Sequence, residues 1–393
     1  MSFSNLRKVA IHYDEAVVQN MLTMLKSAPF PSQALLDPKS PWSLGIDYDY
    51  LSSLKKQFET EWRWDRLENA INKSDNFLVD YADGEDRLQL HFLHKKSERA
   101  DAIPLIMLHG WPGTFFDFHK VIEPLVNPPS PDLPAFHVVA PSLPGYFQSS
   151  LPRRDGWNLL DTAKLFNKLM TDFLGYNKYV GQGGDWGGMI IRFMTSLYPD
   201  SLVSAHFNMF PAPITDDIDR SKFTPQERRI VARWDEFQST GAGYFLLQAT
   251  KPFTIGIAVG SSPLALLAYI GEKMYLWSDP EYLDPVDVLD TVALYFLSSS
   301  FPTSVIVYNQ SSKERTETRV PPPDCKWVVK SKSFGFSYFP YEVGALPKVS
   351  LEKYGNLTFY KEHTHGGHFP ALDSSTELIE DLREFFGANY QVV

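Results

Sequence analysis

The chain has 393 residues, of which 44% are hydrophobic and 21% are charged, a balance that is typical of globular proteins and excludes a mainly disordered chain. The 37 Lys and Arg residues against 47 Asp and Glu residues give a formal net charge of −10. Since the basic runs are no longer than pairs such as Lys95-Lys96 and Arg228-Arg229, no nucleic-acid surface is expected. Cys325 is the one cysteine, which excludes an internal disulfide and a multi-thiolate metal site.

The N-terminal part of the chain, residues 1–98, is predicted to be helical at first and extended later. It begins without the apolar run of a signal peptide, and together with the single cysteine this favours a cytoplasmic protein. The apolar spacing of Tyr50–Phe58 predicts a helix. Apolar and polar residues alternate within Asn76–Tyr81 and Leu88–His94. An Asp-Gly-Glu-Asp turn separates the two segments, so the pattern predicts a hairpin.

Short apolar runs alternate with helical patterns in the next part of the chain. Such runs are typical of parallel strands that are buried on both faces. The predicted strands are Ile103–Leu108, His137–Ala140, Lys178–Gly181 and Val203–Phe210, and the predicted helices are Leu159–Leu174 and Met189–Leu197. This order predicts an α/β protein with a mostly parallel sheet covered on both sides.

The apolar pattern becomes helical throughout 211–300, which predicts a helical lid inserted into an α/β core made of 99–210 and 301–393. Within the lid, 252–271 carries no charge and reaches about the 20 residues that a bilayer requires. Several glycines and the sequence Ser261-Ser262-Pro263 interrupt it, so two short buried helices are favoured over a membrane span.

The C-terminal part of the core is predicted to add two strands and a helix. The strands are Cys325–Val329 and Leu357–Tyr360. The helix starts at Ser374 or Ser375 and runs to about Asn389, with Glu377 placed for a capping box.

The sequence Gly181-Gln-Gly-Gly-Asp-Trp-Gly-Gly188 lies between a predicted strand and a predicted helix. A Gly-x-nucleophile-x-Gly pattern at this junction is a nucleophile elbow, here with Asp185 as the nucleophile. The turn is so tight that side chains two positions before and after it would collide with backbone. The alternative is a glycine-rich loop whose aspartate caps the helix. No Gly-x-Ser-x-Gly sequence exists in the chain, so a serine esterase is excluded.

Two further motifs complete a candidate site. His109-Gly-Trp-Pro-Gly113 follows the first buried strand, and the loop there supplies one N–H group of an oxyanion hole in elbow enzymes. The donors would be the N–H groups of Trp111 and Trp186, although a plain turn would have the same composition.

Three histidines lie close together near the C-terminus, at positions 363, 365 and 368. They also fit a metal site, but no helical i, i+4 pair and no carboxylate–histidine motif accompanies them. His368 follows Gly-Gly after the last strand, where the base of an elbow enzyme lies. The chain order then requires an acid between 185 and 368, for which we choose Glu342; the weaker candidates are Glu352, Glu362 and Asp324.

Taken together, these motifs resemble epoxide hydrolases of the microsomal type, which have the α/β-hydrolase fold. Four motifs carry the resemblance: Gly-Gly-Asp-Trp-Gly, His-Gly-Trp-Pro-Gly, the Pro-Ser-Leu-Pro-Gly-Tyr of 141–146, and Gly-Gly-His-Phe. The stretch Trp62–Asn72 and the segment Leu90–His94 are similar to that family's N-terminal region. The resemblance covers nearly the whole chain. The hydrophobic anchor of membrane-bound relatives is missing at the start, so a soluble, fungal-like member is expected.

The resemblance implies a catalytic triad with Asp185 as nucleophile, His368 as base and Glu342 as its acid partner. It also implies two lid tyrosines that bind the epoxide oxygen. Six tyrosines fall between 211 and 310, and their sequence contexts favour Tyr244 and Tyr308. The expected substrate is a small epoxide, with no metal or organic cofactor, and the family is compatible with a homodimer.

The implied mechanism starts with displacement at an epoxide carbon by Asp185, which gives an ester that His368-activated water hydrolyses to a vicinal diol. A haloalkane dehalogenase is the enzymatic alternative, because it shares the aspartate elbow and the ester, and Trp186 could bind halide. Two lid tyrosines and this N-terminal region favour the epoxide hydrolase. A binding protein on a degenerate hydrolase fold is the third hypothesis, but no triad member is lost.

Overall fold

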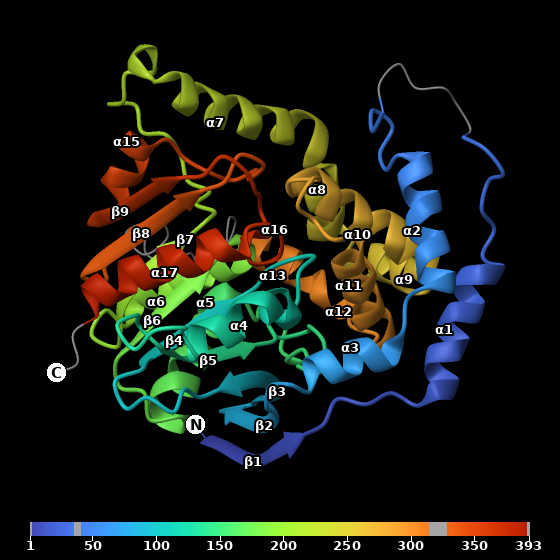
Figure 1. Cartoon of the computed structure of the whole chain (residues 1–393), viewed down its shortest axis with the longest axis horizontal. Helices are drawn as coiled ribbons and strands as arrows, with labels where there is room; N and C mark the ends of the chain where they lie inside the picture. The colour runs from blue at the N-terminus through green and yellow to red at the C-terminus, as the bar shows by residue number, and fades with distance from the viewer. Residues whose placement is uncertain (1, 35–40, 314–327, 391–393) are drawn as a thin grey trace.

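The computed structural model describes residues 2–34, 41–313 and 328–390. Figure 1 shows a central sheet with helices packed on it and a second group of helices beside the sheet. The strands are β1 (Ser2–Val9), β2 (Asn76–Asp83), β3 (Asp86–Lys95), β4 (Ile103–Leu108), β5 (Phe136–Pro141), β6 (Tyr179–Gly183), β7 (Leu202–Phe207), β8 (Ser333–Tyr338) and β9 (Leu357–Glu362). In the sheet they follow the order β1-β2-β3-β5-β4-β6-β7-β8-β9.

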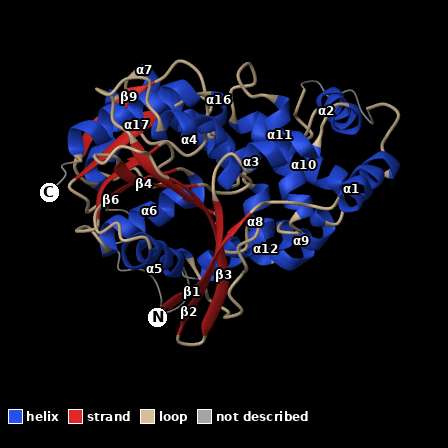
Figure 2. Cartoon of the chain, turned by 60° about the horizontal axis from the view of Figure 1, so that its bottom comes forward, coloured by secondary structure: helices blue, strands red, loops and turns tan. Residues whose placement is uncertain are grey.

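The six strands from β5 to β9 in the sheet order run parallel, whereas β1, β2 and β3 pair antiparallel at the other edge. Every residue of β4 and of β7 is buried, as expected for strands covered on both faces. The covering helices are α4 (His119–Val126), α5 (Leu159–Lys168), α6 (Asp185–Leu197) and α17 (Ser375–Asn389). Figure 2 shows α4 and α17 on one side of the sheet and α5 and α6 on the other. The predicted α/β fold with a mostly parallel sheet is confirmed.

One predicted strand lies mostly outside the described residues. Of Cys325–Val329, the first three residues lie outside the described residues, and 328–329 are irregular. The strand that pairs with β7 is β8, which was not predicted and whose sequence Ser-Phe-Gly-Phe-Ser-Tyr carries polar and small residues at alternate positions. These serines are buried and hydrogen-bonded: the Ser333 hydroxyl lies 2.9 Å from that of Ser204, and Ser337 Oγ lies 2.9 Å from His206 Nε2. Because its polar side chains pair across strands, this buried strand has a composition that resembles a loop.

The N-terminal region combines an edge hairpin with helices. The helices are α1 (Glu15–Ser27), α2 (Tyr48–Thr60) and α3 (Trp64–Ile71). Helix α2 and the β2–β3 hairpin confirm the predictions, and strand β1 was not predicted. Helices α1 and α2 pack against two helices of the lid region (Figure 1), so this region reaches from the sheet edge to the lid.

Helices continue from Pro225 to Lys313, and in the described residues no strand lies between β7 and β8. They are α7 (Pro225–Glu236), α8 (Gly243–Thr250), α9 (Pro252–Gly260), α10 (Pro263–Trp277), α11 (Pro285–Leu297), α12 (Phe301–Ser304) and α13 (Ile306–Lys313). The exact lid boundaries stay a prediction. Helix α11 is tied to two neighbours, since Trp62 Nε1 donates to Asp290 at 2.8 Å and Lys120 Nζ pairs with Asp287 at 2.7 Å.

The uncharged stretch 252–271 forms α9 and the first part of α10, which meet at an angle of 113°. Two separate helices were predicted, and this is confirmed. Burial is confirmed for α10 but is wrong for α9, where Phe253 is 69% exposed and Ile257 is 49% exposed. Among the described residues, no single helix has the length and apolar character to cross a bilayer.

The final helix α17 begins at Ser375 and ends at Asn389, as predicted. The predicted capping box is wrong, because the Ser374 side chain makes no capping hydrogen bond. Glu377, which would complete the box, pairs with His365 instead, with 3.2 Å between Oε1 and Nε2. The helix start is therefore coupled to the histidine-containing loop that precedes it.

Candidate active site

Asp185 lies at the tip of a sharp turn between strand β6 and helix α6. Its φ angle is +47°, in the left-handed region that non-glycine residues rarely adopt. A Cβ atom at Gly183 would lie 2.6 Å from the carbonyl carbon of Gly187, and one at Gly187 would lie 2.1 Å from the oxygen of Leu108. Glycine is therefore required at both positions, and the predicted steric reason for this motif is confirmed.

The loop after β4 brings a hydrogen-bond donor to this carboxylate. The backbone N–H of Trp111 donates to Asp185 Oδ1 at 2.9 Å. His109 holds the loop in place, because its Nε2 accepts from the N–H of Leu143 at 3.1 Å and its Nδ1 lies 3.0 Å from the carbonyl of Gly110. Burial lowers the pKa of His109 to about 4, so the imidazole stays neutral in this role.

The second predicted donor, Trp186, lies in the first turn of α6, where backbone N–H groups have no partner within the helix. Its N–H is therefore available to an oxygen at Asp185, while its ring packs edge-on against Tyr308 with 4.8 Å between centroids.

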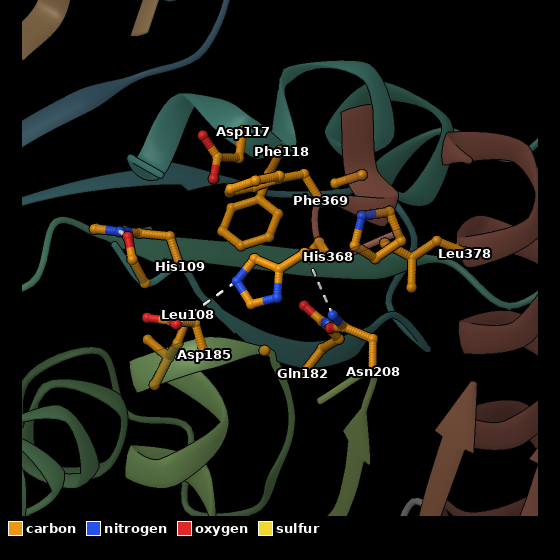
Figure 3. A pocket seen from close by; sticks show the side chains of 14 residues that line it. Leu108, His109, Asp117, Phe118, Gln182, Asp185, Asn208, His368, Phe369 and Leu378 are labelled. Atoms are coloured by element: carbon orange, nitrogen blue, oxygen red, sulfur yellow. Dashed lines mark hydrogen bonds and ion pairs between the residues drawn. The ribbon is translucent and has the colours of Figure 1, made fainter. Parts of the chain in front are cut away.

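His368 lies between two carboxylates. Its Nδ1 is 3.0 Å from both oxygens of Glu342, and its Nε2 is 3.6 Å from Asp185 Oδ2 (Figure 3). Burial by itself lowers the pKa of His368, but Glu342 and Asp185 together raise it to about 10. The structure thus brings together the three residues predicted as nucleophile, base and acid.

Glu342 is held by groups that sequence analysis did not single out. It accepts from the N–H of Gly344 at 2.7 Å and from Asn208 Nδ2 at 3.3 Å. Asn208 also donates to the carbonyl of His368 at 3.3 Å, so one amide links the acid and the base. Its position directly after β7, at the carboxyl end of a parallel strand, is the signal that could have identified it.

The weaker acid candidates lie elsewhere. Glu362 ends β9 and accepts from the Tyr360 hydroxyl at 3.0 Å. Glu352 is exposed on a short 3-10 turn. Asp324 lies outside the described residues.

The other two histidines of the C-terminal motif each have a different partner. His363 Nε2 lies 2.6 Å from Asp381 Oδ2, and His365 pairs with Glu377. The three imidazoles therefore face three different carboxylate environments. In the described ranges, no group of three His, Cys, Asp or Glu side chains could hold a metal ion.

Tyr244 on α8 and Tyr308 on α13 lie over the elbow. Tyr244 stacks on the indole of Trp111 with 5.0 Å between ring centroids, and its own centroid is 5.9 Å from that of Tyr308. The two rings come from different helices and pack edge-on against each other. Burial raises the pKa of both tyrosines well above the ordinary value, and the negative charge of Asp185 adds to this effect. Both hydroxyl groups therefore carry a proton that a leaving oxygen can accept.

The other four lid tyrosines have different surroundings. Tyr275 stacks on Trp42 and Tyr282 on His365. The Tyr295 hydroxyl donates to the carbonyl of Gly113 at 3.0 Å. Tyr269 packs edge-on against Trp111 with 5.9 Å between centroids, so it is the only one of these four to contact that indole in the described structure.

A small cavity of about 30 Å³ lies behind His368 (Figure 3). Its polar lining includes Asp117, Gln182 and Asn208. Gln182 Oε1 is buried and has no hydrogen-bond partner in the described part of the chain, and burial raises the pKa of Asp117 to about 7. A volume of this size holds one or two water molecules. Sequence analysis missed both residues, because a single amide or acid near a strand end has no distinctive pattern.

The fold and the site together define an α/β hydrolase whose elbow carries a carboxylate. The family described as alpha/beta hydrolase fold matches residues 103–257, and the family described as epoxide hydrolase N terminus matches 6–118. The chain belongs to the epoxide hydrolase family, and it is an enzyme that hydrolyses epoxides. The resemblance inferred from the motifs is confirmed.

Relatives match over nearly the full length of the chain. Epoxide hydrolase 1 of Oryctolagus cuniculus is 30% identical, with 88% of this chain and 82% of the relative covered. The structure of Aspergillus niger epoxide hydrolase superimposes with a TM-score of 0.87 at 30% identity and covers 98% of this chain and 97% of that one. Juvenile hormone epoxide hydrolase from the silkworm Bombyx mori gives a TM-score of 0.81 at 26% identity, covering 98% and 94%.

Proposed function

We propose that the enzyme opens its epoxide in two steps, with Asp185 as the nucleophile. Oδ1 accepts the N–H of Trp111, which leaves Oδ2 to attack a ring carbon. As the new C–O bond forms, the bond from that carbon to the epoxide oxygen breaks. Tyr244 or Tyr308 donates a proton to the released oxygen, and the product is a hydroxyalkyl ester of Asp185.

In the second step, His368 removes a proton from water and the hydroxide attacks the ester carbonyl. The oxyanion forms on Oδ1, where the N–H of Trp111 already points; one donor of this kind is worth about 3–4 kcal/mol. The bond from the carbonyl carbon to Oδ2 then breaks, and the proton on His368 passes to the departing alkoxide, which leaves as the diol. The second proton of the water stays on the Asp185 carboxyl and returns to the tyrosine that protonated the epoxide oxygen, so both groups regain their starting state. The cavity behind His368, with Asp117 and Gln182 in its lining, has room for the water.

Alkylation also prepares the base. Two carboxylates raise the pKa of His368 in the free enzyme, and esterification removes the charge of one of them. The pKa of His368 therefore falls when Asp185 becomes an ester, which favours the neutral imidazole at the moment when a base is needed.

The observation that carries this proposal is the position of one carboxylate between a backbone donor and a histidine, beneath two tyrosine hydroxyls. The tyrosines favour an epoxide over a haloalkane. A leaving alkoxide is far more basic than a halide ion, so it gains much more from a proton donor.

Single turnover in oxygen-18 water tests the nucleophile. With enzyme in excess, the label should enter the carboxylate of Asp185 and the first diol should contain no label. Peptide and product mass spectrometry measure both. Direct appearance of the label in that first diol would mean that water attacks the epoxide, and the covalent mechanism would be wrong.

Two broader expectations stay predictions. A homodimer is measured by light scattering of the purified protein, and a cytoplasmic location by imaging of the tagged chain in its own cell. Neither bears on the mechanism, because every residue assigned a role here comes from one chain.

A further inference from the structure

Two lid helices each carry a tyrosine and a polar residue one turn apart on the same face. On α8 these are Tyr244 and Gln248, and on α10 they are Tyr269 and Lys273. The two faces meet: Gln248 Nε2 donates to the Tyr269 hydroxyl at 3.5 Å, and Lys273 Nζ lies 4.2 Å from the ring centroid of Tyr269 and 5.9 Å from that of Tyr244.

The polar groups of Gln248 and Lys273 are buried and only partly satisfied. Gln248 is 0% exposed, and its Oε1 has no partner among the described residues. Lys273 is 6% exposed, and its ammonium pairs with its neighbour Glu272 at 3.1 Å. Burial lowers the pKa of Lys273. Buried polar atoms almost always have partners, so an unpartnered carbonyl beside a buried cation calls for a bound group.

This cluster borders the indole of Trp111, the residue whose backbone N–H binds the nucleophile. Tyr244 stacks on Trp111, and Tyr269 packs edge-on against the same indole. The backbone N–H of Trp111 binds Asp185. An epoxide held between Asp185 and Tyr244 would therefore extend its substituent along a wall that is otherwise aromatic and reach Gln248 and Lys273.

We propose that Gln248, Tyr269 and Lys273 form a polar subsite that binds a hydroxyl group on the substrate, so that the enzyme prefers epoxy alcohols. A hydroxyl can donate to Gln248 Oε1 and accept from Lys273 Nζ at the same time. A carboxylate offers no proton to Gln248 Oε1, and a methyl group leaves both partners unsatisfied. The inference rests on the proposed function, because the epoxide is placed between Asp185 and Tyr244.

The size of the preference follows from the chemistry of the subsite. A site built to hydrogen-bond a substrate hydroxyl discriminates against an analogue that lacks it. Water can replace the hydroxyl here, so we expect roughly a tenfold preference in kcat/KM, well below the largest values of about 10⁵ known for such sites.

Terminal epoxides in a chain-length series, ending in a methyl, a hydroxyl or a carboxylate group, provide the test. At one chain length the hydroxyl compound should exceed its methyl counterpart about tenfold in kcat/KM. This ratio should fall toward one in Gln248→Leu and in Lys273→Met, while Lys273→Arg should retain part of it. Lys251→Met, a change at an exposed lysine of the same lid, should leave the ratio unchanged.

The proposal would be overturned if the hydroxyl compounds had no higher kcat/KM than the methyl compounds at any chain length. It would also be overturned if Gln248→Leu and Lys273→Met both kept the full preference for the hydroxyl compounds. Preference for the carboxylate would overturn the assignment to a hydroxyl. If a variant does not fold, the unaltered enzyme can be tested by competitive inhibition with diols that end in a hydroxyl or a methyl group. The ratio of their inhibition constants then measures the preference for a hydroxyl without any change to the protein. The oxygen-18 experiment tests the nucleophile separately, so failure of the subsite and failure of the covalent mechanism give different results.

Discussion

The two halves of the site are built in different ways. The half in the α/β core consists of ionisable groups fixed by hydrogen bonds: Asp185 by Trp111, and His368 by Glu342. The half in the lid consists of two tyrosines held by ring packing, with Tyr244 stacked on Trp111. The core half must hold charge in a fixed orientation, and the lid half must supply neutral donors to an oxygen whose position differs from one epoxide to another.

This contrast predicts different responses to mutation. Removing a charged group of the core half leaves its partner buried without compensation and should remove a whole chemical step. Removing one hydroxyl of the lid half leaves the other in place, since the Tyr244 and Tyr308 rings lie side by side with 5.9 Å between centroids, so the loss of alkylation rate should be graded.

The largest effect is expected for His368→Gln. Alkylation of Asp185 needs no base, so it should continue, whereas ester hydrolysis should slow by roughly 10² to 10⁴, the usual contribution of a general base. Intact-protein mass spectrometry should detect the enzyme plus the mass of one epoxide. His365→Gln is the matched control, because His365 pairs with Glu377 away from the elbow. If the variant binds substrate without forming an adduct, His368 does not act in the second step.

The next largest effect is expected for the double change of Tyr244 and Tyr308 to Phe. Each single change should slow alkylation roughly tenfold and the double change roughly 10³-fold, within the range for general acids. Hydrolysis of an ester already formed should change much less, because its oxyanion faces the backbone donor of Trp111. Rapid-quench measurement separates the two rates.

This experiment has a control variant and one outcome that would contradict the prediction. Tyr275→Phe is the control, since that ring stacks on Trp42. Full alkylation in the double variant would remove both tyrosines from the mechanism and assign the proton donor to another lid group.

The same contrast explains which parts of the fold and the site could be predicted from the sequence. In the core half, sterics dictate residue type: no side chain fits at Gly183 or Gly187, so the elbow is visible in the sequence. Strand order then places the base after the last strand. Strand β8 was missed for the opposite reason. Its Ser333 pairs with Ser204 and its Ser337 with His206 inside the sheet, and a sequence does not show which polar groups will meet.

In the lid half, the sequence supplies candidates without choosing among them. Tyr244 and Tyr308 come from helices 64 residues apart in chain position, and only the packing of α8 on α13 brings them together. Their choice therefore depended on resemblance. Gln248 and Lys273 were missed for the same reason, because amides and lysines on helices most often face solvent.

A smaller effect is expected for Glu342→Gln, in the pH dependence of hydrolysis. The Glu342 carboxylate raises the pKa of His368, so its neutralisation should lower that pKa. Since the base acts in its neutral form, the rate of ester hydrolysis rises as pH increases through this pKa. The rising limb should therefore move to lower pH in the variant, with a lower plateau because the base is weaker and less well oriented.

Rapid-quench hydrolysis rates between pH 5 and pH 10 would locate both limbs. The conservative variant Glu342→Asp should retain a limb close to that of the unaltered enzyme. An unchanged limb in Glu342→Gln would show that Glu342 acts on the fold of the loop and not on the charge of His368.

The smallest effect concerns stability at Asp117, a buried acid that forms no ion pair with a cation among the described residues. Burial raises the pKa of Asp117 to about 7, against about 3.9 in an unfolded chain. Between these values the folded state binds more protons than the unfolded state, so the free energy of unfolding falls as pH rises, by at most about 1.4 kcal/mol per pH unit.

Asp117→Asn keeps an oxygen for the N–H of Thr114 and removes the titration. The difference in unfolding free energy between pH 5 and pH 8, measured by urea denaturation, should therefore be smaller in this variant, with the exposed change Asp200→Asn as control. A difference as large as in the unaltered enzyme would place the pH-dependent stability in other groups and leave Asp117 ionised in the folded state, as a charged partner for the water beside His368.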